Sequence, residues 1–558
     1  MNEALGERSS RRMHARGVLL RAARNLWITV RDLLAYPFVS RVPRDWVVVR
    51  LDRGLTDGPM PGDWLRAKRV RNLAQVESLL QRAAADSRVR GVLFRVGRAP
   101  LGWAKLRALA RQLEALRDAG KRCVVYAENT GNAGAWLGSL ADAFWMTLEG
   151  RLDLIGIRVS SPYLKKLLDR LGVRGDILKA GRYKGAAEII DRAAMSEASR
   201  EALSEVVDGL YGALVRGLAS GRAESEEQAR EWIDAGPYLA AEAKELGLVD
   251  ELCYADELGE KLAELSGSEE RVPRISDLAY ARVSQPAFAF EPLSGGQRVG
   301  VVPISGVIRS IETTARPVAR ALQRAARDTR VAAVVLRIDS PGGDALASDL
   351  IWRAVRKLRE KMPVVASLSD TAASGGYYAA CAADEIFAED TTLTGSIGVI
   401  LAGLEFDELL SRLGVNFDGV QRGEHSAIYD PYRRRSQGER ALLKRQVRHH
   451  YETFLERVAE GRSKSTQEIA PAAEGRVWTG ARARELELGD HLGGLSDAVA
   501  RAGALAEICG PPDEPVWLSP QPSLLDRMRN LEAARSPLLE TEPWLEMQYY
   551  CPVAIALR

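Results

Sequence analysis

Cysteine and histidine are scarce in this sequence, which has five of each among 558 residues. The cysteines lie far apart and form no CxxC pair, so a disulfide-stabilised scaffold is excluded. A zinc site needs clustered ligands, and the five histidines do not supply them. We therefore predict buried, free thiols and no metal site. The cysteines are Cys123, Cys253, Cys381, Cys509 and Cys551.

An excess of charge of one sign is also absent. The chain has 78 basic and 75 acidic side chains, which leaves a net charge of +3. This balance excludes a general attraction of the whole chain to nucleic acid. The hydrophobic share of 46% and the charged share of 27% are typical of a globular protein.

No run of 18 apolar residues occurs, so the sequence lacks a standard transmembrane helix. The nearest candidate is residues 17–42, which Arg21, Arg24 and Arg31 interrupt. Its apolar residues recur at helical spacing, which leaves two interpretations open. One is a basic amphipathic helix on a membrane surface, and the other is a helix docked on the body of the protein. The arginines also argue against a cleavable signal peptide.

The sequence contains one unit twice. Residues 91–96 (GVLFRV) match residues 333–338 (AVVLRI), so that Arg95 and Arg337 are 242 positions apart. The pairs Gly156 and Gly398, and Gly181 and Gly423, keep the same spacing. Self-similarity at a fixed spacing indicates a structural repeat. We predict five segments: a basic amphipathic N-terminal segment (1–45), a first repeat (46–265), a linker (266–296), a second repeat (297–508) and a tail of unassigned role (509–558).

Each repeat alternates short apolar strands with helical stretches. The first has strands at 46–51 and 123–127 around a helix at 101–119, and the second has strands at 299–304 and 363–368 around a helix at 345–361. Alternation of this kind predicts βαβ units, and continuously apolar strands predict sheets covered on both faces. The predicted fold class is α/β, with two tandem repeats of parallel sheets flanked by helices.

The two repeats differ where chemistry is expected. In the second repeat a strand ends in Ser340-Pro341-Gly342-Gly343, and a Gly-Gly pair lets backbone N–H groups point into a cleft and hold an oxyanion. A later strand leads to Ser374-Gly375-Gly376, where a strand-to-helix turn would expose a nucleophilic hydroxyl. The first repeat has neither feature. Taken alone, each segment is also compatible with an ordinary turn.

A serine needs a base to take its proton, and only His425 lies near these motifs. The repeat register offers another base, because Lys184 of the first repeat corresponds to Ser426 of the second. The first repeat has the lysine and the second has the serine, so the two repeats could together form one Ser–Lys dyad. The lysine must be neutral to act as a base, and burial in an apolar cleft lowers a lysine pKa. Ser396, whose counterpart is Leu154, could accept its hydrogen bond. A surface lysine and a turn serine are the alternatives.

With these residues in view, the chain resembles the signal peptide peptidase A family in its long, duplicated form. Four motifs carry the resemblance, which covers about residues 46–505. They are RIDSPGG (337–343), SDTAASGGYY (369–378), TGSIGV (394–399) and GRYKGAAE (181–188). The sequence departs from the family in one respect, because the clear N-terminal transmembrane anchor of the long forms is replaced by the arginine-interrupted segment.

The resemblance implies a crotonase-like fold shared with the Clp protease, and a membrane-associated serine endopeptidase. It implies Ser374 as nucleophile, Lys184 as general base and Ser396 as the residue that orients the lysine. The amides of Gly375, Gly342 and Gly343 would form the oxyanion hole, without metal or cofactor. It further implies a homotetramer at the bacterial inner membrane, on an unassigned side, that cleaves signal peptides and other apolar peptides.

Two other functions remain open from the sequence. A crotonase-type acyl-CoA enzyme could use the same fold, and it would bind CoA without needing Ser374 or Lys184. A non-catalytic membrane scaffold could retain the fold with a degenerate dyad. Labelling of Ser374 by a serine-reactive phosphonate would separate the scaffold from the protease. No nucleic-acid partner is expected.

Overall fold

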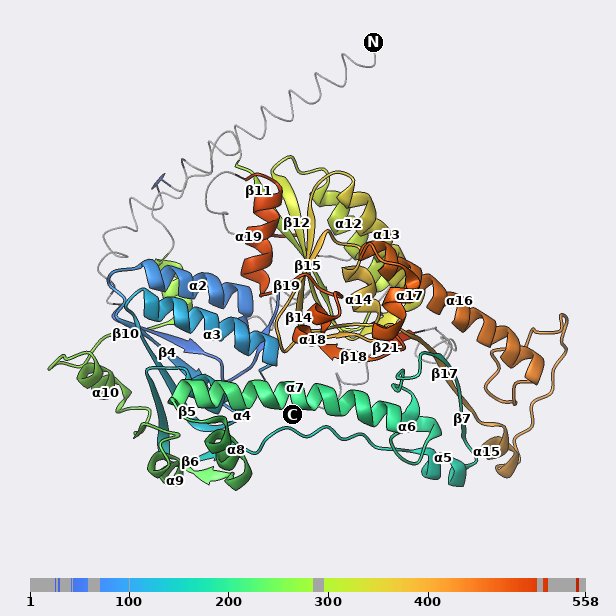
Figure 1. Ribbon diagram of the computed structural model, residues 1–558, viewed down its shortest axis with the longest axis horizontal. Coiled ribbons are helices and arrows are strands. Elements are labelled where there is room, and N and C mark those ends of the chain that lie inside the picture. The colour runs from blue at the N-terminus through green and yellow to red at the C-terminus, as the bar shows by residue number, and fades with distance from the viewer. Residues whose placement is uncertain are drawn as a thin grey trace, which may run out of the picture.

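Two mostly parallel β-sheets, one in each half of the chain, organise the computed structural model (Figure 1). The structure describes residues 44–58, 71–99, 101–284, 296–508, 515–519 and 548–550, with a few isolated positions before residue 44. Apart from those isolated positions, the predicted amphipathic segment at 17–42 lies outside the described residues, as does most of the tail at 509–558. Among the described residues, no helix has both the length and the hydrophobicity that crossing a bilayer requires.

The first repeat has a sheet with the strand order β10-β1-β4-β5-β6-β8, and β9 also pairs with β6. Its strands are β1 (Trp46–Arg50), β4 (Gly91–Val96), β5 (Arg122–Gly131), β6 (Ala143–Asp153), β8 (Tyr238–Leu239), β9 (Glu251–Leu252) and β10 (Arg274–Ser276). Its helices are α2 (Leu73–Ala85), α3 (Trp103–Asp118), α4 (Asn132–Ser139), α7 (Glu197–Arg222), α8 (Glu226–Ala235), α9 (Ala240–Glu245), α10 (Leu258–Leu265) and α11 (Asp277–Val283). A small separate pair joins β2 (Leu55–Thr56) to β3 (Arg71–Asn72).

The second repeat has a sheet with the order β18-β16-β14-β12-β11-β20, extended by β15 and β19. Its strands are β11 (Arg298–Ser305), β12 (Val331–Ser340), β14 (Val364–Ala373), β15 (Glu385–Ala388), β16 (Leu393–Gly395), β18 (Val477–Thr479), β19 (His491–Leu492) and β20 (Val516–Trp517). Its helices are α12 (Arg316–Ala325), α13 (Ala345–Arg359), α14 (Gly375–Ala380), α16 (Gln437–Gly461), α17 (Thr466–Ile469), α18 (Gly480–Glu485) and α19 (Leu495–Leu505), with single turns at Ile311–Ala315 and Ala470–Ala472.

Alternate residues of each central strand face different helices. In β12, Val334 and Leu336 belong to the core that packs under α12 and α13, while Ala333 and Val335 pack with α19. Successive side chains of a strand point to opposite faces, so a strand covered on both sides is expected to be mostly apolar. The predicted α/β class with two tandem repeats is therefore observed.

A third sheet joins the two repeats. Its order is β13-β21-β17-β7, formed by Gly342–Asp344, Gln548–Tyr550, Val399–Glu405 and Arg174–Ala180. β7 of the first repeat pairs antiparallel with β17 of the second along seven residue pairs. The short helices α5 (Lys165–Leu171), α6 (Glu188–Asp191) and α15 (Asp407–Arg412) accompany these strands.

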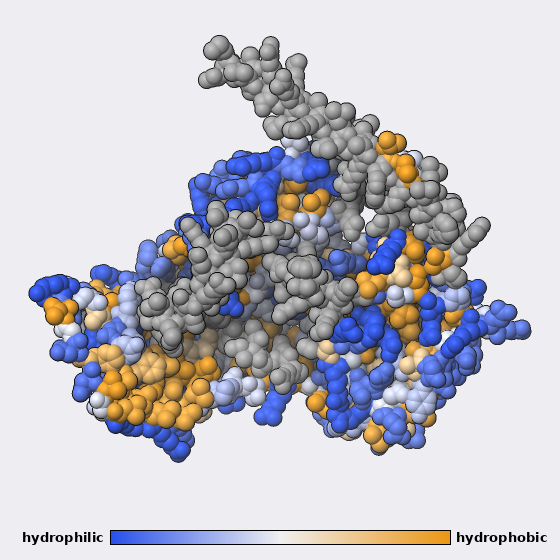
Figure 2. All heavy atoms as spheres, turned by 180° about the vertical axis from the view of Figure 1, so that it is seen from behind, coloured by the Kyte–Doolittle hydropathy of each residue, from blue (hydrophilic) through white to orange (hydrophobic). Residues whose placement is uncertain are grey.

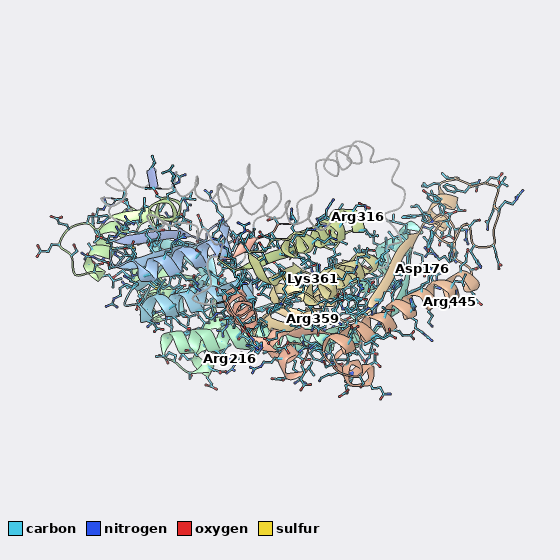
Figure 3. The ribbon with its side chains drawn as sticks, turned by 90° about the horizontal axis from the view of Figure 1, so that it is seen from above. Asp176, Arg216, Arg316, Arg359, Lys361 and Arg445 are labelled. Atoms are coloured by element: carbon cyan, nitrogen blue, oxygen red, sulfur yellow. The ribbon has the colours of Figure 1, made fainter. Side chains whose placement is uncertain are left out.

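Ion pairs and one long helix reinforce this connection. Asp176 on β7 is buried and accepts a 2.6 Å hydrogen bond from Arg435, and Arg440 on α16 also pairs with it. Figure 3 shows Asp176 beside the helix that carries Arg445. Helix α7 extends from the first repeat beneath strands of the second, where Val206 and Leu210 pack with Ala373 (Figure 1).

The segment expected as a linker is partly regular structure. Residues 274–276 form β10, which adds to the sheet beside β1, and α11 follows it. Strand pairing outweighs the Ser- and Pro-containing composition there, because Ile275 is buried in the first core. Cys123, Cys253 and Cys381 are buried and free, while Cys509 and Cys551 lie outside the described residues.

Candidate active site

Ser374 stands at a sharp turn between the end of β14 and the start of α14. Its backbone has φ 55° and ψ −118°, a conformation that non-glycine residues rarely adopt. Its amide donates a 2.7 Å hydrogen bond to the carbonyl of Gly395, and its side chain is fully buried. Such strain persists only where the surroundings hold it and is common at active sites. The helix begins at Gly375, directly after the serine.

Lys184 belongs to the first repeat and reaches the second through the third sheet. The last residue of β7, Ala180, pairs with Val399, and the chain then turns towards the second repeat. Gly181 has φ 109°, and a Cβ on Gly475 would lie 2.7 Å from the Cβ of Lys184. A side chain at Gly181 would strain the turn and one at Gly475 would clash. Both glycines therefore allow the lysine loop to pack this closely.

The side chains of Lys184, Ser374 and Ser396 meet within one chain. Lys184 Nζ lies 2.6 Å from Ser374 Oγ, 3.0 Å from Ser396 Oγ and 2.9 Å from the Ser396 carbonyl oxygen. All three side chains are fully buried. Hydroxyl and carbonyl oxygens can accept from either a neutral amine or an ammonium group, so this arrangement can exchange a proton between Nζ and Ser374 Oγ.

The glycine turn after β12 lies against the start of α14. Gly342 and Gly343 have φ values of 102° and 152°, and a Cβ on Gly343 would lie 2.0 Å from the carbonyl oxygen of Ile308. A Cβ on Gly375 would approach the Gly343 amide nitrogen to 3.2 Å, so these two backbones are close neighbours. The Gly342 amide donates to Ser340 Oγ at 3.2 Å. The Gly342 amide therefore already has an acceptor in Ser340 Oγ, and Gly343 and Gly375 are neighbours at the start of α14.

Strand β21 lies beside the same glycine turn. Gly342 pairs with Tyr550 and Gly343 with Tyr549 in antiparallel register, and Ile400 on the other side pairs with Gln548. Sequence reasoning assigned no role to this tail. Its position between β13 and β17 means that an extended segment runs along the turn that precedes the candidate site.

The sequence did not single out a second lysine near the site. Lys105 on α3 lies within ion-pair distance of Asp339 and Asp370, which occur in the quoted motifs without an assigned role. The repeat register contains no signal for it, because residue 347 of the second repeat is an alanine. The available signal was the presence of Asp339 and Asp370 within these motifs, each after an apolar run.

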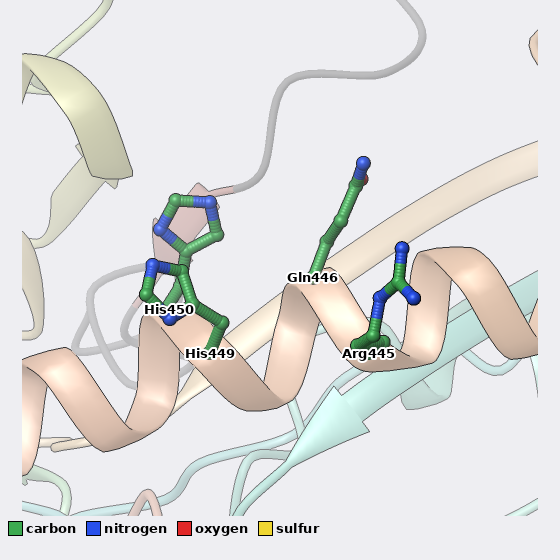
Figure 4. Close-up of a pocket in the computed structure, with 4 residues that line it drawn as sticks. All are labelled: Arg445, Gln446, His449 and His450. Carbon is green, nitrogen blue, oxygen red and sulfur yellow. The ribbon is translucent and has the colours of Figure 1, made fainter.

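A pocket of about 540 Å³ lies on one face of α16, lined by Arg445, Gln446, His449 and His450 (Figure 4). Burial and the neighbouring His449 lower the pKa of His450, while Asp344 after the glycine turn opposes the shift. The Lys184 side chain hydrogen-bonds Ser374 and Ser396. His425, the histidine nearest the motifs in sequence, is exposed on a loop.

Comparison with known proteins places these features in context. Residues 115–269 and 356–509 match the model of peptidase family S49. The chloroplastic serine protease SPPA of Arabidopsis thaliana is 31% identical over 87% of this chain and 73% of its own length. Protease 4 of Haemophilus influenzae is 31% identical over 70% of this chain and 65% of its own length.

A ClpP1 mutant from Listeria monocytogenes is a structural neighbour with 16% sequence identity. It covers 36% of this chain and 94% of its own length, with a TM-score of 0.26.

Proposed function

Since this chain belongs to peptidase family S49 and is a serine protease, we propose that Ser374 is its nucleophile and Lys184 the general base. The observation that carries the proposal is the 2.6 Å contact between Lys184 Nζ and Ser374 Oγ, fully buried and formed across the two repeats. A base must lie within about 2.6–3.2 Å of the proton that it removes. This contact meets that requirement.

The reaction is acyl transfer to water. Neutral Lys184 takes the Ser374 proton while Oγ bonds to the scissile carbonyl carbon. Collapse of the tetrahedral intermediate breaks the C–N bond, and the lysine ammonium gives its proton to the leaving amine. Water then attacks the acyl-enzyme and loses a proton to Lys184. The acyl C–O bond breaks, the acid product leaves, and the lysine ammonium returns the proton to Ser374 Oγ. Burial favours the neutral amine that the first step requires.

Ser396 and the glycine amides complete this mechanism. Ser396 contacts Nζ through both its hydroxyl and its carbonyl, and this pair of contacts would orient the lysine. The Gly375 and Gly343 amides would hold the oxyanion. A preorganised N–H donor of this kind contributes about 10²–10³-fold to kcat. Gly342, the third expected donor, would contribute by shaping the turn, since its amide donates to Ser340 Oγ. No step requires a metal or cofactor.

We propose unfolded apolar peptides, including cleaved signal peptides, as the substrates, following the family that the motifs resemble. The basic N-terminal segment supports action at a membrane surface, because nine arginines precede Trp46 against four acidic residues. Cationic, apolar segments bind anionic lipid surfaces. The inner membrane of a bacterium is the corresponding proposed location.

We also propose a homotetramer. An exposed apolar surface, the apolar arm, supports assembly, and Figure 2 shows it at the end of the molecule that carries α5 and α15. It comprises Leu167, Leu171, Leu413, Phe417 and Val420, which are 47–88% exposed. Contiguous exposed apolar patches mark interaction sites.

Light scattering should give a mass four times that of the chain. The double variant Leu413→Ser with Phe417→Ser should reduce this mass, and a monomeric wild type would contradict assembly.

The dyad is tested by Ser374→Ala and Lys184→Met. We expect each to lower hydrolysis of an unstructured apolar peptide by about 10³-fold or more, because removing either member of a nucleophile–base pair abolishes the covalent step. A serine-reactive phosphonate should label wild-type Ser374 and fail to label Lys184→Met at a comparable rate. Circular dichroism checks that each variant is folded.

Lys179→Met is the matched control. Lys179 lies on β7 five residues before Lys184, is 35% exposed and pairs with Glu188 at 3.6 Å. This variant should hydrolyse peptide at the wild-type rate. Wild-type activity in Ser374→Ala or Lys184→Met would overturn the dyad. Absence of labelling in the wild type would favour the scaffold, and CoA binding would favour the acyl-CoA enzyme.

A further inference from the structure

Lys105 is a second lysine of the first repeat that is buried against the second. It lies on α3 and is 5% exposed. Its Nζ is 3.1 Å from Asp57 Oδ2 and 3.0 Å from Asp339 Oδ2, and it also bonds Asp370. Asp57 comes from the first repeat, whereas Asp339 and Asp370 come from the second. One ammonium group thus joins three carboxylates across the two halves.

The two second-repeat carboxylates lie where the central strands lose their regular pairing. Ile338 of β12 pairs with Leu368 of β14, but the next pair joins Ser340 to Ala372. Strand β14 therefore advances four residues while β12 advances two, which is a bulge. Within this bulge, Asp339 accepts a 3.2 Å hydrogen bond from the Thr371 amide. Beyond it, β12 leads to Gly342 and Gly343, and β14 leads to Ser374.

Lys105 connects the two strands at this interruption. It bonds Asp339 on β12 and Asp370 on β14, so its ammonium spans the gap that regular ladder hydrogen bonds would otherwise close. Asp370 is held from the same helix a second time, because the amides of Ala104 and Lys105 donate to its Oδ1 at 3.0 and 3.2 Å. Bulges redirect the residues that follow them, and this bulge is fixed by α3 of the other repeat.

The surroundings keep Lys105 charged. Burial by itself would lower its pKa, but the carboxylates of Asp370, Asp57 and Asp339 raise it. Burial, with Asp57 nearby, raises the pKa of Asp339. Arg337, fully buried, bonds Asp57 at 2.6 Å and anchors it from the opposite side. A charged lysine among carboxylates forms strong hydrogen bonds, whereas Lys184 contacts the hydroxyls of Ser374 and Ser396.

We propose that Lys105 is a positioning residue for the peptidase site: its contacts with Asp339 and Asp370 set the separation between the glycine turn and Ser374. The inference rests on the proposed function, because it concerns the geometry of that same site. The first repeat thereby contributes two lysines with different tasks. Lys184 exchanges the proton. Lys105 holds β14, which leads to Ser374, in register with β12, which leads to Gly342 and Gly343.

Lys105→Met tests this proposal, since methionine keeps the length of the side chain without its charge. We expect kcat to fall about 10–100-fold with KM changed less than threefold, because misplacement of a site by about 1 Å costs on the order of 10²-fold. The rate at which a phosphonate labels Ser374 should fall in parallel. The control is Arg107→Gln on the same helix, which removes a 3.0 Å ion pair to Asp390 that also joins the repeats but is 41% exposed at the arginine. Its kcat should stay within twofold of wild type.

The double variant Lys105→Met with Asp370→Asn separates positioning from charge balance. It removes one cation and one carboxylate together, so it should recover thermal stability lost in Lys105→Met. If Lys105 positions the strands, kcat stays low in the double variant. Recovery of both stability and kcat, or a wild-type kcat in Lys105→Met, would overturn the inference. If Ser374→Ala keeps wild-type activity, the proposed function itself fails; if only Lys105→Met is normal, the dyad stands without the positioning role.

Discussion

At the scale of single residues, Ser396 combines backbone strain with a contact to the proposed base. Its φ is 54°, and its hydroxyl and carbonyl both contact Lys184 Nζ. Ser396→Ala removes the hydroxyl but keeps the carbonyl, so we expect kcat to fall about fivefold, corresponding to the net worth of one buried hydrogen bond, about 1 kcal/mol. Steady-state hydrolysis of an apolar peptide measures it.

Two variants separate contact from strain. Ser396→Gly should lose the same kcat yet be more stable to heat than Ser396→Ala, because glycine adopts positive φ without penalty. Ser463→Ala alters an exposed serine with φ 52° and should leave kcat unchanged. A wild-type kcat in both Ser396 variants would mean that the hydroxyl does not orient the lysine.

A buried carboxyl near the contact between the repeats predicts a pH dependence of stability. Burial raises the pKa of Glu77 to about 7, above its ordinary value of 4.5. The folded protein therefore binds this proton more tightly, so the stability that it contributes is complete below pH 4.5 and is lost as the pH rises to about 7. Glutamine stays neutral at every pH. Glu77→Gln should therefore raise the free energy of unfolding relative to wild type by up to about 3 kcal/mol more at pH 8 than at pH 5.

Denaturant unfolding at the two pH values measures this difference. Glu114→Gln, on the exposed side of α3, provides the comparison and should show the same offset at both. A Glu77→Gln effect that does not change with pH would show that the carboxyl is ionised in the folded protein throughout this range.

At the scale of elements, β21 occupies an edge that a peptide could use. Extended peptides bind exposed strand edges by main-chain hydrogen bonds, and β21 pairs with β13 at Gly342 and Gly343. Removal of residues 548–558 should therefore lower KM for an apolar peptide several-fold. Removal of 551–558 alone leaves β21 in place and should have little effect. Equal kinetics for the two truncations would show that β21 does not compete with substrate.

The elements also show which parts of the fold can be predicted from the sequence. Strands such as β4 and β12 are mostly apolar and repeat at a fixed offset, so both pattern and register identify them. The pairing of β7 with β17 carries no such signal, because these short strands lie in different repeats and side-chain alternation does not specify a partner. The same holds for β21, whose partners are two strands separated in sequence from the tail by about 150 residues or more.

At the scale of the whole molecule, comparison of the repeats predicted which residues would meet. Ser374 and Lys184 stood out because each is present in one repeat and missing from the other, and Ser396 differed in the same way. Whether they meet within one chain depends on the third sheet, which the sequence could not reveal. Lys105 escaped notice for a related reason, since its partners flank a bulge that exists only in the folded second repeat.

The order of synthesis has a consequence for a chain built in this way. Of the three residues, Lys184 is synthesised first and Ser374 follows much later. Gly475, against which the lysine loop packs closely, is synthesised after both. At about 5–20 residues per second, the ribosome needs on the order of 15–60 s to proceed from Lys184 to Gly475. Under the proposed dyad, a nascent chain cannot cleave its neighbours during that interval, so each molecule becomes a protease only when nearly all of it has been translated.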